Sequence, residues 1–117
     1  MEQLIDASTG AIVVAKLKVA DNFWRRLRGL QFQRELAIDA GLLLTPCRSI
    51  HTHWMRFAID VIMLDDHGII LDVRGNLQPW KAVAGPPETR AILEVTAGSP
   101  AGQLPLGTRL VRSEAKK

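Results

Sequence analysis

The sequence predicts a mainly β protein: a β-sandwich or flattened barrel with one short helix. Most of the chain consists of short apolar segments that suit strands, and clusters of turn residues separate them. Only one segment has apolar residues at helical spacing, and there is no internal repeat or linker. The 117 residues are therefore expected to form one domain, residues 1–117, with residues 113–117 as a frayed tail.

The first part of the chain is expected to be a hairpin followed by the helix. LIDASTGAIVVAKLKVA contains a short strand, a Ser-Thr-Gly turn and a second strand over residues 11–19. Asp21 suits the N-cap of a helix over residues 22–28, and Gly29 is placed to end it. The apolar residues of this helix share one face, which leaves its arginines toward water.

The middle of the chain is expected to hold the clearest hairpin. An apolar run at residues 41–44 predicts a buried strand, and residues 49–64 favour continuous extended structure. Asp65-Asp66-His67-Gly68 then supplies turn chemistry before a strand over residues 69–73.

The last third is expected to hold a loop and two strands. Residues 76–87 contain several turn residues and three of the six prolines, which predicts an irregular surface loop. Strands over residues 90–96 and 108–112 complete the chain.

Charge and composition argue against several classes of protein. Hydrophobic residues make up 47% of the chain and charged residues 23%, as in globular and not in disordered proteins. The net charge is only +3, with acidic residues interspersed throughout. The densest basic run, Arg25 to Arg34, suits a solvated helix face as well as a phosphate-binding patch, so we do not expect nucleic-acid binding.

The sequence also carries signals on compartment. The single cysteine excludes an intrachain disulfide and suits a reducing compartment. No run approaches the roughly 20 apolar residues needed to span a bilayer, and the N-terminus lacks a basic segment followed by an apolar one. The expected location is therefore cytoplasmic, without a membrane span, and the oligomeric state is left open.

Residues 46–57, PCRSIHTHWMRF, gather most of the reactive side-chain types in the sequence. On an unbroken strand His51, His53 and Met55 share one face, which is wholly apolar from Met55 onward. The two histidines are thus expected where the core-facing side ends, and the intervening tryptophan and arginine point the other way.

The histidine pair allows a metal hypothesis. His51 and His53 on one strand are separated by roughly 7 Å at their Cβ atoms, a spacing that can converge on one divalent cation. The candidate third ligands are Cys47, Asp60, Asp72 and Glu94. Two histidines at a sheet rim, bonded to backbone or water, are the alternative interpretation.

Three other residues allow both a functional and a structural interpretation. Cys47 is roughly 13 Å from His51 on an extended strand, which favours an inert buried cysteine over a nucleophile. Asp60 interrupts an apolar strand, so it is either an acid that orients a ligand or an anchor for backbone amides. Trp80, in a proline-rich segment, either faces a ligand or partner or pins its loop to the core.

Three blocks together resemble a known family: RLRGLQFQREL, then GLLLTPCRSIHTHWMRFAIDVIMLDDHGIIL, then AILEVTAG. Their order and content resemble the family called domain of unknown function 192, an ancient conserved bacterial region, over about residues 10–112. The positions that carry the resemblance are Arg28, Gly29, Leu30, Trp54, Met55, Arg56, Asp60, Glu94 and Gly98.

The resemblance implies a compact β-sandwich of jelly-roll type with a short helix, and it implies little about activity. The family commonly has proline where this chain has Ala58, and methionine where it has Gln31. A proline at that position suggests a strand break that turns Asp60 toward the histidines. The resemblance implies an export signal in many relatives, whereas none is expected in this chain.

Three functional hypotheses remain open. The leading one is a small-ligand-binding β-sandwich whose cleft suits an anionic or polyhydroxylated ligand. Its expected ligand-binding residues are Arg48, His51, His53, Trp54, Arg56 and Asp60. The second is a metal-dependent hydrolase or isomerase with His51 and His53 as ligands and Asp60 or Glu94 as base. The third is a structural or partner-binding module that uses Trp80 and the arginine-bearing helix.

Overall fold

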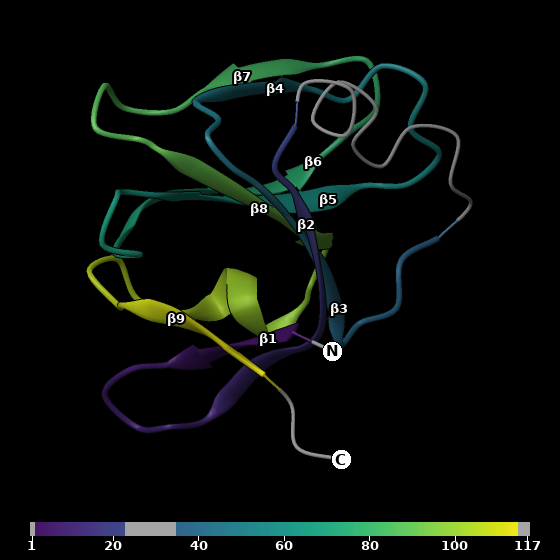
Figure 1. Cartoon of the computed structure of the whole chain (residues 1–117). Coiled ribbons are helices and arrows are strands. Elements are labelled where there is room, and N and C mark those ends of the chain that lie inside the picture. The colour runs from purple at the N-terminus through teal and green to yellow at the C-terminus, as the bar shows by residue number, and fades with distance from the viewer. Residues whose placement is uncertain (1, 23–34, 115–117) are drawn as a thin grey trace.

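The computed structural model describes residues 2–22 and 35–114. Within these ranges the chain forms nine strands and one short 3-10 helix (Figure 1). Their bounds are β1 Glu2–Asp6, β2 Ile12–Ala20, β3 Ala40–Leu44, β4 Ser49–His51, β5 Ile59–Leu64, β6 Ile70–Leu77, β7 Ala82–Ala84, β8 Ala91–Thr96, η1 Pro100–Gln103 and β9 Leu110–Glu114.

The strands form two sheets. Seven strands make one sheet in the order β6-β5-β8-β3-β2-β1-β9, and β4 pairs with β7 in a second, two-stranded sheet. Neighbouring strands are antiparallel except β2 and β3, which run parallel. In Figure 1 the small sheet lies at the opposite end of the view from β1 and β9.

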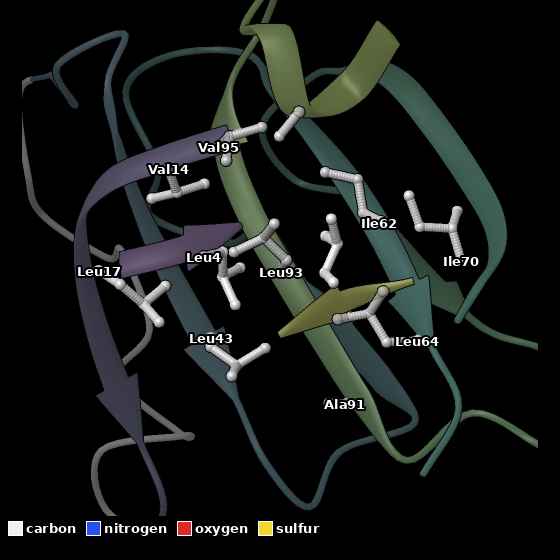
Figure 2. Close-up of a cluster of buried hydrophobic side chains, with 12 residues drawn as sticks. Leu4, Val14, Leu17, Leu43, Ile62, Leu64, Ile70, Ala91, Leu93 and Val95 are labelled. Carbon is white, nitrogen blue, oxygen red and sulfur yellow. The ribbon is translucent and has the colours of Figure 1, made fainter. Parts of the chain in front are cut away.

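The large sheet curls over its own hydrophobic core (Figure 2). Leu4 on β1 and Leu110 on β9 belong to the same buried cluster as Ile62 in β5, on the far side of the strand order. A single bridge between Ile69 and Arg109 joins the regions of β6 and β9. The sheet is nevertheless not a closed barrel.

The other face of the large sheet packs beneath the small sheet. Ile50 of β4 and Val83 of β7 contact a second cluster that includes Ile59, Val61 and Met63 of β5. Ile62 and Leu64 of β5 point into the first cluster instead. Because side chains alternate along a strand, β5 is buried on both faces and all six of its residues are buried.

The mainly β prediction is confirmed. The hairpins around residues 7–11 and 65–69 form where the turn residues predicted them. The helix predicted over residues 22–28, with its arginines, lies outside the described residues except for Asn22. No helix in the described ranges is long and apolar enough to cross a membrane.

Two predicted segments were wrong. Residues 49–64 are not one strand, because β4 ends at His51 and β5 begins only at Ile59. Residues 76–87 are not wholly irregular, because β6 continues to Leu77 and β7 pairs with β4. Both differences arise from contacts between these two segments, which lie about 30 residues apart.

Candidate functional site

A buried threonine holds the broken strand against the segment after β6. Thr52 is fully buried, and its hydroxyl donates to the Gln78 carbonyl at 2.7 Å and accepts from the Lys81 amide at 2.8 Å. Its own amide donates to the Lys81 carbonyl at 2.7 Å. Its carbonyl accepts from the amides of Trp80 at 3.0 Å and Met55 at 3.2 Å. One residue therefore fixes two turns, residues 52–55 and 78–81.

These two turns bring four aromatic rings together. His51 stacks on His53 with ring centroids 4.7 Å apart, and His53 lies 5.2 Å from Trp80. The rings of Trp54 and Trp80 meet edge to face at 4.7 Å. We call the group His51, His53, Trp54 and Trp80 the aromatic platform.

The two tryptophans of the platform are exposed and have unusual backbone conformations. Trp54 is 55% exposed and Trp80 is 56% exposed. Both have a φ of +67°, in the left-handed region that bulky residues rarely adopt. Non-glycine residues in this region cost about 1–3 kcal/mol each, and they cluster at functional sites. The Thr52 bonds hold both turns in this conformation.

The platform borders a shallow groove on the small sheet. The groove has a volume of about 430 Å³ and is lined by residues of β4 and β7, among them His51. Nδ1 of His51 is buried and has no hydrogen-bond partner in the described part of the chain. The Arg48 Nε donates to the Gly85 carbonyl at 3.3 Å, beside the end of β7. Arg48 and Arg56 are both exposed.

Sequence reasoning missed Thr52, which is the residue that organises the site. Its hydroxyl contacts backbone groups 26 and 29 residues away, so no local pattern reveals its role. The one available signal was a small polar residue between the two histidines, on the strand face opposite the one predicted to lie toward the core.

Replacing Thr52 by valine is expected to lower the free energy of unfolding by about 2 kcal/mol. Valine keeps the shape but removes the hydroxyl, which leaves the Lys81 amide and the Gln78 carbonyl unsatisfied near the core. The turns that carry Trp54 and Trp80 lose the hydrogen bonds of the Thr52 hydroxyl, so tryptophan fluorescence should change in the native state. Urea denaturation measures the first effect, and Thr108→Val is the control because the Thr108 hydroxyl makes one exposed contact. Equal stability of the two variants would contradict the assignment.

Asp60 lies on the other face of the large sheet. One of its oxygens accepts from the Asn76 amide at 2.8 Å, and the other accepts from the Gly98 amide at 3.0 Å. A Cβ at Gly102 would collide with this carboxylate, so η1 approaches it closely only because residue 102 is glycine. The break in the strand therefore does not place Asp60 among the histidines: both of its oxygens bind backbone amides.

Glu94 is a buried carboxyl in β8. It is 3% exposed, and its Oε1 has no hydrogen-bond partner among the described residues. Burial raises its pKa from 4.5 to about 8. Glu94 pairs across the strands with Val61, whereas Asp60 pairs with Val95. Directly opposed residues share a face, so the two acids lie on opposite faces of the sheet and form no catalytic pair.

The remaining candidate ligands do not gather around the histidines. The Cys47 thiol donates to the Ser49 carbonyl at 3.1 Å, and Asp72 binds the Arg74 Nε at 2.9 Å. Within residues 2–22 and 35–114 there is no group of three or more His, Cys, Asp or Glu side chains that could hold a metal ion. A metal site at His51 and His53 stays a hypothesis that needs a further ligand.

Comparison with known proteins decides the family. The model of domain of unknown function 192, described as an uncharacterised ACR, matches residues 4–110. The chain belongs to this family. The match spans nearly all strands described above, including the segments that carry the platform, Asp60 and Glu94.

Several relatives of this chain carry the name UPF0127. The proteins of Pyrococcus horikoshii and Pyrococcus furiosus are 33% and 31% identical over 71% and 67% of this chain, and 74% and 69% of their own lengths. A protein of Thermococcus sibiricus is 29% identical over 81% of this chain, and the match spans 64% of that relative. These relatives are archaeal, so the family is not confined to bacteria.

Two crystal structures share the fold. A Novosphingobium aromaticivorans protein of unknown function superposes with a TM-score of 0.79 at 17% identity, over 94% of this chain and 82% of that one. A Sinorhizobium meliloti protein, provisionally named a transcription regulator, gives 0.81 at 22% identity over 95% and 91%. At such identities the likeness shows the fold alone.

Proposed function

We propose that the protein binds a small polyhydroxylated ligand on the aromatic platform. The observation that carries the proposal is the pair of exposed tryptophans at positive φ, held side by side by Thr52. Exposed indole faces stack on the apolar faces of sugar-like rings, while neighbouring polar groups bond the hydroxyls.

Polar side chains lie along the groove that the rings border. His51 lines this groove on the small sheet and is half-buried, with its unpartnered Nδ1 buried. Arg48 precedes β4, at the end of the β4–β7 pair away from His51, where its cation would favour a ligand that extends along the groove and carries an anionic group. The proposed ligand-binding residues are therefore Arg48, His51, His53 and Trp54, joined by Trp80.

Two residues predicted to bind the ligand, Asp60 and Arg56, lie outside the centre of the proposed contact surface. Asp60 does not belong to the proposed contact surface, because both of its oxygens bind backbone amides on the other face of the large sheet. Arg56 is exposed and lies just after the 52–55 turn, where it would contact only a ligand that extends beyond the tryptophans.

The proposal is tested with variants that keep the backbone. Glycine adopts a positive φ without strain, so Trp54→Gly and Trp80→Gly should remain folded while removing one ring each. Titration calorimetry with maltohexaose, cellohexaose and glucose 6-phosphate is expected to show saturable binding of at least one probe. Each glycine variant should weaken that binding by about 2- to 10-fold, because an aromatic stacking contact contributes about 0.5–1.5 kcal/mol.

Leu106→Ala is the matched control, since Leu106 is a large apolar side chain that is 62% exposed outside the platform. It should leave the affinity unchanged. Binding that survives loss of both rings, or the absence of binding to every probe, would reject the proposal. Self-association that disappears in the tryptophan variants would instead assign the platform to a protein partner.

A further inference from the structure

A second groove lies away from the platform residues. It has a volume of about 560 Å³ and opens where the ends of β3 and β5 and the start of β8 face β9. A volume of this size suits a small molecule. None of the platform residues lines it.

The floor of this groove is apolar. It is lined by Leu4, Leu43, Leu64 and Leu110, which belong to the core cluster under the curled sheet. Each of them is at most 5% exposed, so the groove reaches down to the core at the open end of the curl. An apolar ligand chain laid over this floor would remove its own hydrocarbon surface from water.

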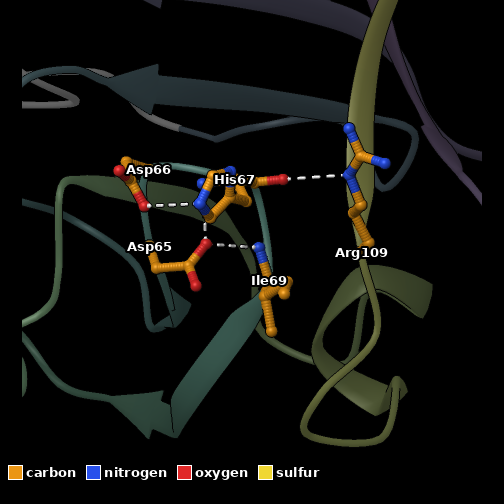
Figure 3. Close-up of polar contacts among 5 residues, drawn as sticks. All are labelled: Asp65, Asp66, His67, Ile69 and Arg109. Carbon is orange, nitrogen blue, oxygen red and sulfur yellow. Dashed lines mark hydrogen bonds and ion pairs between the residues drawn. The ribbon is translucent and has the colours of Figure 1, made fainter.

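The rim of the groove carries two arginines whose positions are fixed by neutral groups. Arg109 donates from Nε to the His67 carbonyl at 3.1 Å (Figure 3). Arg90 donates from Nη1 to the carbonyls of Pro87 at 2.9 Å and Thr89 at 3.0 Å. Neither arginine forms an ion pair with a carboxylate in the described ranges, so each guanidinium is oriented by neutral groups alone.

The other charged groups on the rim already have partners. Asp65 accepts from the amides of His67 and Ile69 at 2.8 and 2.9 Å, and Asp66 lies 3.5 Å from the His67 ring (Figure 3). Arg112 binds Glu2 at 2.7 Å. Asp65 and Asp66 thus balance the charges of Arg90 and Arg109, but each of these arginines uses only one guanidinium nitrogen within the described ranges, which leaves N–H donors for a ligand.

We propose that this groove binds a small amphipathic carboxylate. Its apolar chain lies on the leucine floor, and its carboxylate accepts hydrogen bonds from Arg90 and Arg109. Arginine suits this role because its planar donors match the two oxygens of a carboxylate. The proposal does not depend on ligand binding at the platform.

Decanoate, below the concentration at which it forms micelles, is the test probe. Calorimetry should show saturable binding at one site, and amide shifts in a two-dimensional NMR titration should map to residues 64–68, 90–91 and 109–112. Decanol, which lacks the charge, should bind about 10-fold more weakly or worse, because charge-assisted hydrogen bonds are lost.

The double variant Arg90→Gln/Arg109→Gln should weaken decanoate binding by about 10-fold or more, with an unchanged melting temperature because both side chains are exposed. Arg74→Gln is the matched control: Arg74 is an exposed arginine on β6 outside the groove, and it should leave affinity within about twofold.

Three results would overturn the proposal. One is decanol binding as tightly as decanoate, and another is a double variant that keeps full affinity. The third is arginine-dependent sedimentation with anionic phospholipid vesicles without binding of free decanoate, which would assign the groove to a lipid surface.

Discussion

Replacing Asp60 by alanine is expected to lower the free energy of unfolding by about 2–4 kcal/mol. The carboxylate is 4% exposed and accepts one amide hydrogen bond from the end of β6 and one from the turn after β8. Hydrogen bonds to a charged group are worth about 1.5–3 kcal/mol each, and water can re-solvate the two freed amides only in part. Equilibrium denaturation in urea measures the loss.

Two further variants separate this anchor from a general effect of charge. Asp60→Asn keeps the size and one acceptor oxygen, so it should lose about half as much stability as Asp60→Ala. Asp72→Ala removes a carboxylate whose ion pair with Arg74 is largely exposed, and it should cost less than about 1 kcal/mol. Comparable losses for Asp60→Ala and Asp72→Ala would contradict the anchoring role.

The fold could be predicted wherever local residues decide it. The turn at Asp65 to Gly68 forms because the Asp65 carboxylate accepts the amides of His67 and Ile69, which lie two and four residues on. Gly68 has a φ of +82° and packs against the Leu110 backbone, which no side chain would permit. The four residues from Asp65 to Gly68 are therefore enough to predict this turn from the sequence.

The sequence identified several residues of the candidate site but not their arrangement in space. The sequence singled out His51, His53 and Trp54, but it placed them on a strand that continued to Leu64. The turn at 52–55 exists because Thr52 bonds to a segment that begins 26 residues later, and Trp80 joins the histidines through that same contact. Tertiary hydrogen bonds overrode an extended pattern that was locally consistent.

The two buried acids show the same limit. Both Asp60 and Glu94 were recognisable as carboxyls in apolar strands. Only the register of β5 against β8, with Val61 opposite Glu94, shows that they face different layers. Asp60 meets two amide donors there, whereas Oε1 of Glu94 meets none among the described residues. Asp60 therefore anchors two backbone amides, whereas burial favours the neutral form of Glu94.

Stability is expected to fall with rising pH because of Glu94. Its pKa is about 8 in the folded protein, against an ordinary value of 4.5 when the chain is unfolded. Below pH 4.5 both states hold the proton, and above pH 8 neither does. Between these values only the folded state holds it, so the free energy of unfolding decreases by about 1.4 kcal/mol per pH unit, or about 4–5 kcal/mol across the window.

Glu94→Gln removes this dependence, because glutamine fills a similar volume and carries no titrating proton. The variant should match the native protein near pH 4.5 and exceed its stability by about 3–5 kcal/mol at pH 8.5, as measured by urea denaturation at both pH values. Comparing the two proteins cancels the titration of the other carboxyls. Glu88→Gln, at an exposed position, should leave the pH profile unchanged. Parallel profiles for the native protein and Glu94→Gln would show that Glu94 is ionised in the fold, which would require a cation beside its Oε1.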